Sequence, residues 1–151
     1  MKPLLILLTV FFLSSLVTYL FNQHVIALQL SARIAMAAML VFTSVAHFAF
    51  WKGMVLMLPK FIPFKKQVVY FTGIIELLAA VGLLIPQTVQ ATGVALIIFF
   101  VAILPSNINA AMQHVNLEKA DYSGSGIRYL WFRVPLQLFL IAWVLYSAVL
   151  L

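Results

Sequence analysis

The sequence predicts an all-α, polytopic membrane protein, in which a four-helix transmembrane bundle follows an additional N-terminal transmembrane helix. Of the 151 residues, 66% are hydrophobic and only 8% are charged. A soluble domain could not cover so much apolar surface with so few polar groups. The apolar residues also gather in runs of about 20, the length at which a helix crosses a ~30 Å hydrocarbon core. We therefore expect a single transmembrane domain over residues 1–151, embedded in a lipid bilayer.

Five helices are expected at five apolar runs, which turn residues and charges separate. The first run is longer than the core of a signal peptide, and no small-residue cleavage site follows it, so we predict an uncleaved helix. Pro105 interrupts the fourth run, but helical spacing resumes beyond it. The predicted spans are residues 3–21, 31–50, 68–85, 89–104 with an extension to 114, and 130–151.

Residues 51–66 are too short and too broken by Pro59 and Pro63 to cross a membrane. This segment carries four lysines beside Trp51 and two phenylalanines. Aromatic and basic residues together are typical of chain that lies among the headgroups of an anionic leaflet. We expect an interfacial segment on the cytoplasmic side.

The distribution of Lys and Arg predicts the orientation. Five spans with a cytoplasmic N-terminus and an outer C-terminus place every cation except Arg33 on the cytoplasmic side. The net charge of +6 therefore reflects membrane orientation. No basic face with interleaved aromatics is present, so we expect no nucleic-acid partner. The predicted location is a bacterial-type inner (plasma) membrane.

Glu76 is an acidic residue whose position needs an explanation, because it lies midway along the third apolar span. A charge at the centre of a bilayer costs at least about 2.5–3.5 kcal/mol, so it normally faces protein, pairs with a cation or stays protonated. Small residues beside it favour close helix packing and an inward-facing side chain. Two interpretations remain open: an ion pair with Arg133 or Arg33 that fixes packing, or a protonatable ligand for a quinone headgroup or a transported species.

Other polar side chains lie on the predicted inner faces of the helices. His47 shares one face of the second span with Arg33 and Ser44, and Asn107 shares a face with His114. Such residues in a bundle hydrogen bond to one another or line a small cavity. The predicted ligand-binding or buried polar cluster comprises Glu76, His47, Arg133, Asn107, Gln137, Arg33 and His114.

Several chemistries are excluded or disfavoured. Cysteine is absent, so the chain cannot itself carry a disulfide, ligate an iron–sulfur cluster or attach haem through thioethers. The histidines form no HxxxH or ExxH pair, so we predict no metal site. With no nucleophile elbow or phosphate loop, the chain is expected to be non-enzymatic, or at most a subunit of a membrane oxidoreductase. The sequence identifies no cofactor, although a quinone suits such a site.

A series of motifs runs in order through the last three quarters of the chain. These are Arg33 with His47-Phe48, Leu58-Pro-Lys-Phe-Ile-Pro-Phe64, Tyr70-Phe-Thr-Gly-Ile-Ile-Glu-Leu-Leu78, Gly82-Leu-Leu-Ile-Pro86, Pro105-Ser-Asn-Ile-Asn109 and Leu130-Trp-Phe-Arg-Val-Pro-Leu-Gln137. Together they resemble the DoxX family of small membrane proteins. The resemblance implies a four-helix core formed by the second to fifth spans. It also implies a link to membrane redox complexes, as for the related DoxD subunit of thiosulfate:quinone oxidoreductase.

The chain departs from the DoxX pattern at Ser106 and Asn109, where a small residue and often an aromatic one are expected. The absence of cysteine argues against a direct sulfur or thiol role.

Three functions are compatible with these observations. The first is an accessory protein that binds a quinone or lipid within a redox complex, with membrane redox proteins as partners. The second is a small proton-coupled transporter or exporter that acts as a homo-oligomer, because one bundle of this size encloses little volume. The third is a structural scaffold.

Overall fold

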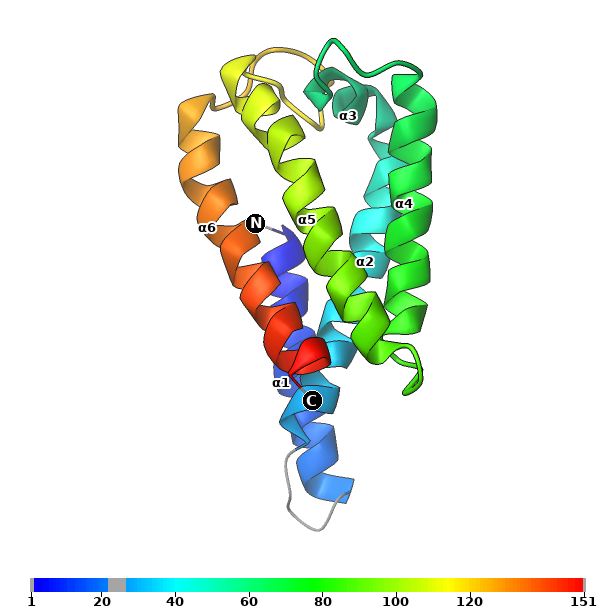
Figure 1. The fold of residues 1–151 in the computed structure, drawn as a ribbon. Coiled ribbons are helices and arrows are strands. Elements are labelled where there is room, and N and C mark those ends of the chain that lie inside the picture. The colour runs from blue at the N-terminus through cyan, green and yellow to red at the C-terminus, as the bar shows by residue number, and fades with distance from the viewer. Residues whose placement is uncertain (1, 22–26, 151) are drawn as a thin grey trace.

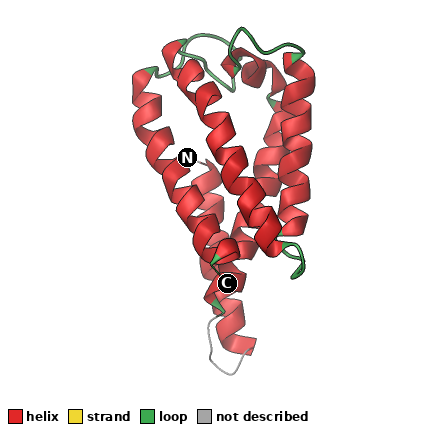
Figure 2. Cartoon of the chain, viewed as in Figure 1, coloured by secondary structure: helices red, strands yellow, loops and turns green. Residues whose placement is uncertain are grey.

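A computed structural model describes residues 2–21 and 27–150, and its regular structure is helical throughout. Figures 1 and 2 show an elongated bundle of antiparallel helices. The helices are α1 (Lys2–Phe21), α2 (Leu28–Ala49), α3 (Trp51–Met57), α4 (Lys65–Gly82), α5 (Val89–Met112) and α6 (Ile127–Val144), followed by the π-helical turn η1 (Leu145–Val149). Within the described ranges the only β interaction is an isolated bridge between Asn116 and Asp121.

The central element of the bundle is α2, which contacts α1, α4, α6 and η1. Its buried face carries Ala35, Met36 and Leu40, each with 0% of its surface exposed. These residues recur at helical spacing and pack with Leu96 of α5 and Val144 of α6. Small and flexible side chains let helix backbones approach closely, which supplies the van der Waals attraction between helices in lipid.

The helix α1 belongs to the bundle, although its final part and the start of α2 project beyond the other helices (Figure 1). Leu7 is fully buried in the common core. Phe11 meets Trp143 edge to face at 5.0 Å between ring centroids. The indole N–H of Trp143 in turn donates a 3.0 Å hydrogen bond to the carbonyl of Ala32. Whether this helix touches the core was open from the sequence, and these contacts answer it.

Four of the described helical segments are long and apolar enough to cross a membrane: α1, α2, α5 and Ile127–Val149. The exposed surface carries many large apolar side chains, as lipid contact requires. The chain is therefore a helical multi-pass membrane protein. The third predicted span, residues 68–85, corresponds to α4, which lies against α2. Helix α4 contains Lys65, Lys66 and Glu76 and is accordingly more polar than the other four long helical segments.

Prolines shape the helices much as the sequence predicts. Helix α5 passes through Pro105 and continues to Met112, which confirms that helical structure resumes beyond this proline. Residues 51–66 do not form a long helix: α3 ends at Met57, and an extended Leu58 leads into the chain around Pro59 and Pro63. Together with the 113–126 connection, this segment closes one end of the bundle (Figure 1).

Candidate functional site

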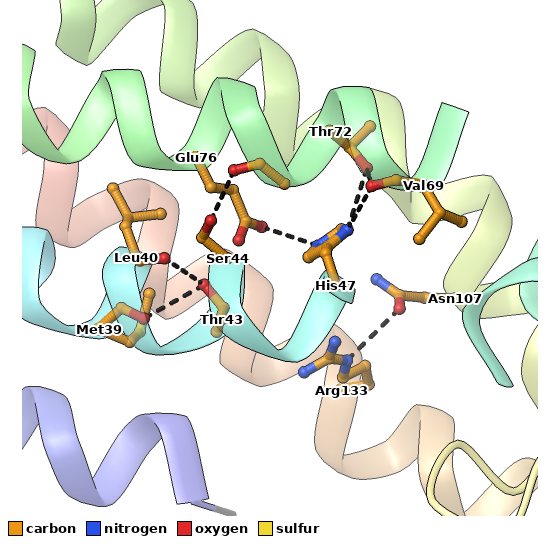
Figure 3. Close-up of polar contacts among 11 residues, drawn as sticks. Met39, Leu40, Thr43, Ser44, His47, Val69, Thr72, Glu76, Asn107 and Arg133 are labelled. Atoms are coloured by element: carbon orange, nitrogen blue, oxygen red, sulfur yellow. Dashed lines mark hydrogen bonds and ion pairs between the residues drawn. The ribbon is translucent and has the colours of Figure 1, made fainter. Parts of the chain in front are cut away.

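A buried carboxyl group meets a histidine at the interface between α2 and α4 (Figure 3). The Nε2 atom of His47 lies 3.4 Å from Oε1 of Glu76, and the two side chains are 15% and 7% exposed. Both residues belong to the cluster predicted from the sequence. The predicted cation partners of Glu76 were wrong, because neither Arg133 nor Arg33 pairs with it in the described structure, where His47 takes that place.

Close packing of α2 against α4 brings these two side chains together. Gly73 of α4 faces His47, and a Cβ atom at that glycine would lie 2.8 Å from Cβ of His47. The hydroxyl of Ser44 donates a 2.8 Å hydrogen bond to the carbonyl of Gly73. Glycine at this position thus allows the approach, and the serine fixes the register of the two helices.

The other ring nitrogen of His47 reveals how protons are distributed in the pair. Nδ1 lies 3.0 Å from the carbonyl oxygen of Val69 and 3.1 Å from Oγ1 of Thr72. The Thr72 hydroxyl also donates to the Val69 carbonyl at 2.9 Å. A carbonyl only accepts, so the tautomer that satisfies this network carries its proton on Nδ1.

With Nδ1 protonated, a hydrogen bond across the contact between His47 and Glu76 would require one further proton on the pair. Either a protonated Glu76 donates to a neutral Nε2, or a charged histidine donates through Nε2–H to the carboxylate. Both forms have the same total charge. In either form the pair would be neutral as a whole, which would lower the cost of burying it among apolar helices.

The second carboxyl oxygen of Glu76 is left without a partner. Oε2 is buried and accepts or donates no hydrogen bond among the described residues. Buried polar atoms in proteins are nearly always satisfied, so an unpaired oxygen at a charged or proton-sharing group is an exception that calls for an explanation. It provides a free hydrogen-bonding position at the membrane-embedded pair.

A separate chain of hydrogen bonds links α5 and α6. Arg133 donates from Nε to Oδ1 of Asn107 at 3.4 Å, and Asn107 donates from Nδ2 to Oε1 of Gln137 at 3.0 Å. Gln137 donates onward to the backbone carbonyl of Phe100. This carbonyl lies next to that of Val101, whose usual intrahelical donor is missing because Pro105 has no N–H. Every link runs in one direction, from the arginine into the core.

The guanidinium of Arg133, at the start of this chain, uses only its Nε–H in the hydrogen bonds found among the described residues. Its guanidinium also lies 5.7 Å from the ring of Tyr129, and Nε is the donor that the amide uses. Figure 3 shows Arg133 and Asn107 below His47 in this view, and no dashed line joins them to His47 or Glu76. The predicted cluster is thus divided in two: the pair on α2 and α4, and the amide chain on α5 and α6.

Two predicted members lie outside both groups. Arg33 donates to the carbonyl of Gln29 within its own helix at 3.3 Å, near the opposite end of α2 from His47. His114 is exposed just beyond α5, with a positive φ of 53°, and packs against Gly126. The helical face that His114 shares with Asn107 is lost because α5 ends at Met112. No group of three acidic or histidine side chains suitable for a metal occurs in the described ranges.

Thr72 is the functional neighbour that the sequence analysis missed. It lies four residues before Glu76 on α4 and therefore on the same helix face, and this spacing is the signal that could have identified it. Its hydroxyl contacts His47 and orients the ring toward the carboxyl group.

One known protein family matches most of the chain. A family model described as a domain of unknown function, DUF8561, matches residues 36–148. The matched region contains both the His47–Glu76 pair and the Arg133–Asn107–Gln137 chain, whereas α1 lies outside it. No curated protein and no solved structure matches the chain.

Proposed function

The chain belongs to the DUF8561 family, whose function is unknown, and we propose that it is an accessory membrane protein that binds a quinone or lipid headgroup at the His47–Glu76 pair. The observation that carries this proposal is the buried, unpartnered Oε2 of Glu76. Val69 and Thr72 already hold the His47 ring, which contacts Glu76, so a ligand would meet a preorganised carboxyl group.

The chemistry of the pair suits a headgroup that carries hydroxyl or carbonyl oxygens. In its carboxylate form Glu76 accepts a hydrogen bond from a hydroxyl, such as that of a quinol or a glycerol. In its protonated form it can donate to a quinone carbonyl when the proton lies on Oε2 and is not shared with Nε2 of His47. The single shared proton lets the pair serve either ligand without a net charge in the bundle.

The proposed cellular context rests on the sequence. The ordered motifs that resemble DoxX suggest a partnership with a membrane redox complex. For orientation, α3, the 58–64 segment, the start of α4 and the 113–126 connection lie at one end of the bundle. They carry Lys52, Lys60, Lys65, Lys66 and Lys119. Under the positive-inside rule that end faces the cytoplasm, which puts the C-terminus outside a bacterial-type inner membrane.

A second function, proton-coupled transport of a small solute, is favoured by the same pair for a different reason. A carboxyl group and a histidine that share one proton form a unit that can load and release protons within a membrane. In this case the free Oε2 would mark the proton pathway. A homo-oligomer would then provide the volume that one bundle lacks.

Substitution Glu76→Gln separates these functions. Glutamine keeps the size of the side chain and can donate to a neutral His47, so the bundle should fold with nearly the same thermal stability. The matched control is Glu118→Gln, the same chemical change on an exposed loop. Both variants and the wild type would be purified in mild detergent and analysed by native mass spectrometry and lipid extraction.

A quinone or lipid that is retained by the wild type and the control, but lost from Glu76→Gln, supports the binding function. If Glu76→Gln retains every quinone and lipid that the wild type and the control retain, the binding function is contradicted. Transport is tested on the same proteins in liposomes, where Glu76→Gln should abolish the pH dependence of solute flux. A marked loss of stability in Glu76→Gln, with no retained ligand in the wild type, would reduce the pair to a structural contact.

A further inference from the structure

A second polar site lies where α3 meets α4, and two lysines converge there on one indole ring. The Nζ atoms of Lys66 and Lys52 lie 4.6 Å and 5.8 Å from the centroid of the Trp51 ring. Lys66 is also 5.7 Å from the ring of Tyr70. In the described part of the chain neither ammonium group pairs with a carboxylate, since Glu76 bonds to His47 and Glu118 bonds to Lys2.

Packing holds this site in place. Tyr70 stacks on Phe48 at 5.5 Å and meets Trp51 at 6.4 Å. Gly53 lies so close to the backbone of Leu117 that any side chain there would clash with the carbonyl group. The amide of Asn109 donates a 2.8 Å hydrogen bond to the carbonyl of Met57 at the end of α3. The short helix is therefore anchored on two sides, and the indole has a defined position.

A shallow apolar groove, wide open to its surroundings, continues from this site along the outer face of α4. It has a volume of about 510 Å³ and is lined by Gln67, Val68, Tyr70, Phe71 and Ile74. Tyr70 belongs to both the aromatic cluster and the groove, so the two features are continuous. Helical spacing places Phe71 and Ile74 on the face of α4 opposite Val69 and Glu76. The groove is therefore separate from the His47–Glu76 pair.

We propose that this is a binding site for an anionic phospholipid, with the phosphate on Lys52 and Lys66 and one acyl chain in the groove. Two cations without a counter-ion supply the charge complementarity. Trp and Tyr rings are amphipathic and belong at the level of the headgroups. Since α4 runs from this end into the bundle, a headgroup at Lys66 leads its chain directly toward Phe71 and Ile74.

Native mass spectrometry with added phosphatidylglycerol or phosphatidylcholine of identical acyl chains tests this site. The variant is Lys52→Gln with Lys66→Gln, at two exposed positions whose substitution leaves the core intact. The control is Lys119→Gln with Arg128→Gln, which removes the same charge at the same end of the bundle. Each lysine at a lipid surface contributes about a fivefold gain in affinity, so the variant should lose about 30-fold in phosphatidylglycerol binding. The control should lose much less, because in the described structure neither Lys119 nor Arg128 lies over the Trp51 or Tyr70 ring.

The site is overturned if the wild type binds both lipids equally, or if variant and control lose affinity to the same degree. Inorganic phosphate in large excess distinguishes a lipid from a free anion, because the groove holds a chain that phosphate lacks. Phosphatidylglycerol should remain bound, and its complete displacement would contradict the acyl-chain part of the proposal. Glu76→Gln should leave this binding unchanged, so the outcome is independent of the function proposed for the His47–Glu76 pair.

Discussion

Asn107 donates a 3.0 Å hydrogen bond to Gln137 across the interface of α5 and α6, with only 3% and 7% of the two residues exposed. The same amide accepts from Arg133 through its oxygen. Asn107 therefore uses both ends of its side chain, and it is the one residue that connects the arginine to the core. Its position makes it the best test of what the hydrogen-bond chain contributes.

Asn107→Ala should destabilise the bundle by about 1–2 kcal/mol, because it leaves two polar partners unsatisfied in an apolar interface. The free energy of unfolding can be measured by titrating the detergent-solubilised protein with SDS while helix content is followed. Gln90→Ala is the control, since it truncates an exposed amide on the same helix. Equal losses in the two variants would show that the chain of amides adds no stability.

The His47–Glu76 contact should appear as an energetic coupling. A double-mutant cycle with His47→Ala and Glu76→Ala isolates the interaction from the cost of each truncation. We expect a coupling energy of about 0.5–2 kcal/mol, the range for buried polar pairs between membrane helices. The same SDS titration measures it. Additive single-variant effects would mean that the 3.4 Å contact does not stabilise the fold.

Gly73→Ala should destabilise the protein although alanine is the better helix former. The added Cβ would lie 2.8 Å from Cβ of His47, an atom next to the backbone that cannot move without shifting α2. Overpacking of this kind typically costs about 1–3 kcal/mol.

Gly82→Ala provides the comparison on α4, because the atoms nearest to its new Cβ belong to the side chain of Thr92, whose γ atoms can turn away. Thermal unfolding in detergent should give a lower melting temperature for Gly73→Ala than for Gly82→Ala. The reverse order would show that the approach of α2 to α4 is not close at Gly73.

Much of the fold could be predicted because membrane helices follow simple length and polarity rules. Apolar runs and prolines located the five long helices, including the passage of α5 through Pro105, whereas the short helix α3 in the interfacial segment was not predicted. The burial of Glu76 was also predictable, since a carboxyl group at that depth must face protein.

The partner of Glu76 could not be predicted, because it depends on how neighbouring helices are rotated about their axes. Each residue turns the helix by about 100°, so a small change in rotation or depth exchanges one inward-facing side chain for another. The close approach at Gly73 brings α2 toward α4 and selects His47. Arg133 instead faces Asn107, because α6 packs against α5.

The bond between Lys2 and Glu118 should respond to pH, and it ties the start of α1 to the 113–126 connection. The Lys2 ammonium donates a 2.8 Å hydrogen bond to Glu118, and this bond and its charge lower the pKa of the carboxyl group below its ordinary value of 4.5. A carboxyl group whose pKa falls on folding stabilises the folded state above its ordinary pKa. That contribution is lost as the pH falls through the lowered pKa. Both side chains are largely exposed, so salt should weaken the effect.

Carboxyl ¹³C NMR titration of Glu118 is the direct measurement. The wild type should titrate below 4.5, and Lys2→Gln should return the pKa toward that value. Lys119→Gln is the control, because the charge of Lys119 acts on Asp121. Hydrogen bonds from Ser123 are the main cause of the lowered pKa of Asp121, and the charge of Lys119 adds to it. The control should therefore leave the titration of Glu118 unchanged. An ordinary pKa for Glu118 in the wild type would mean that the contacts of α1 with α2 and Trp143 hold it without help from this ion pair.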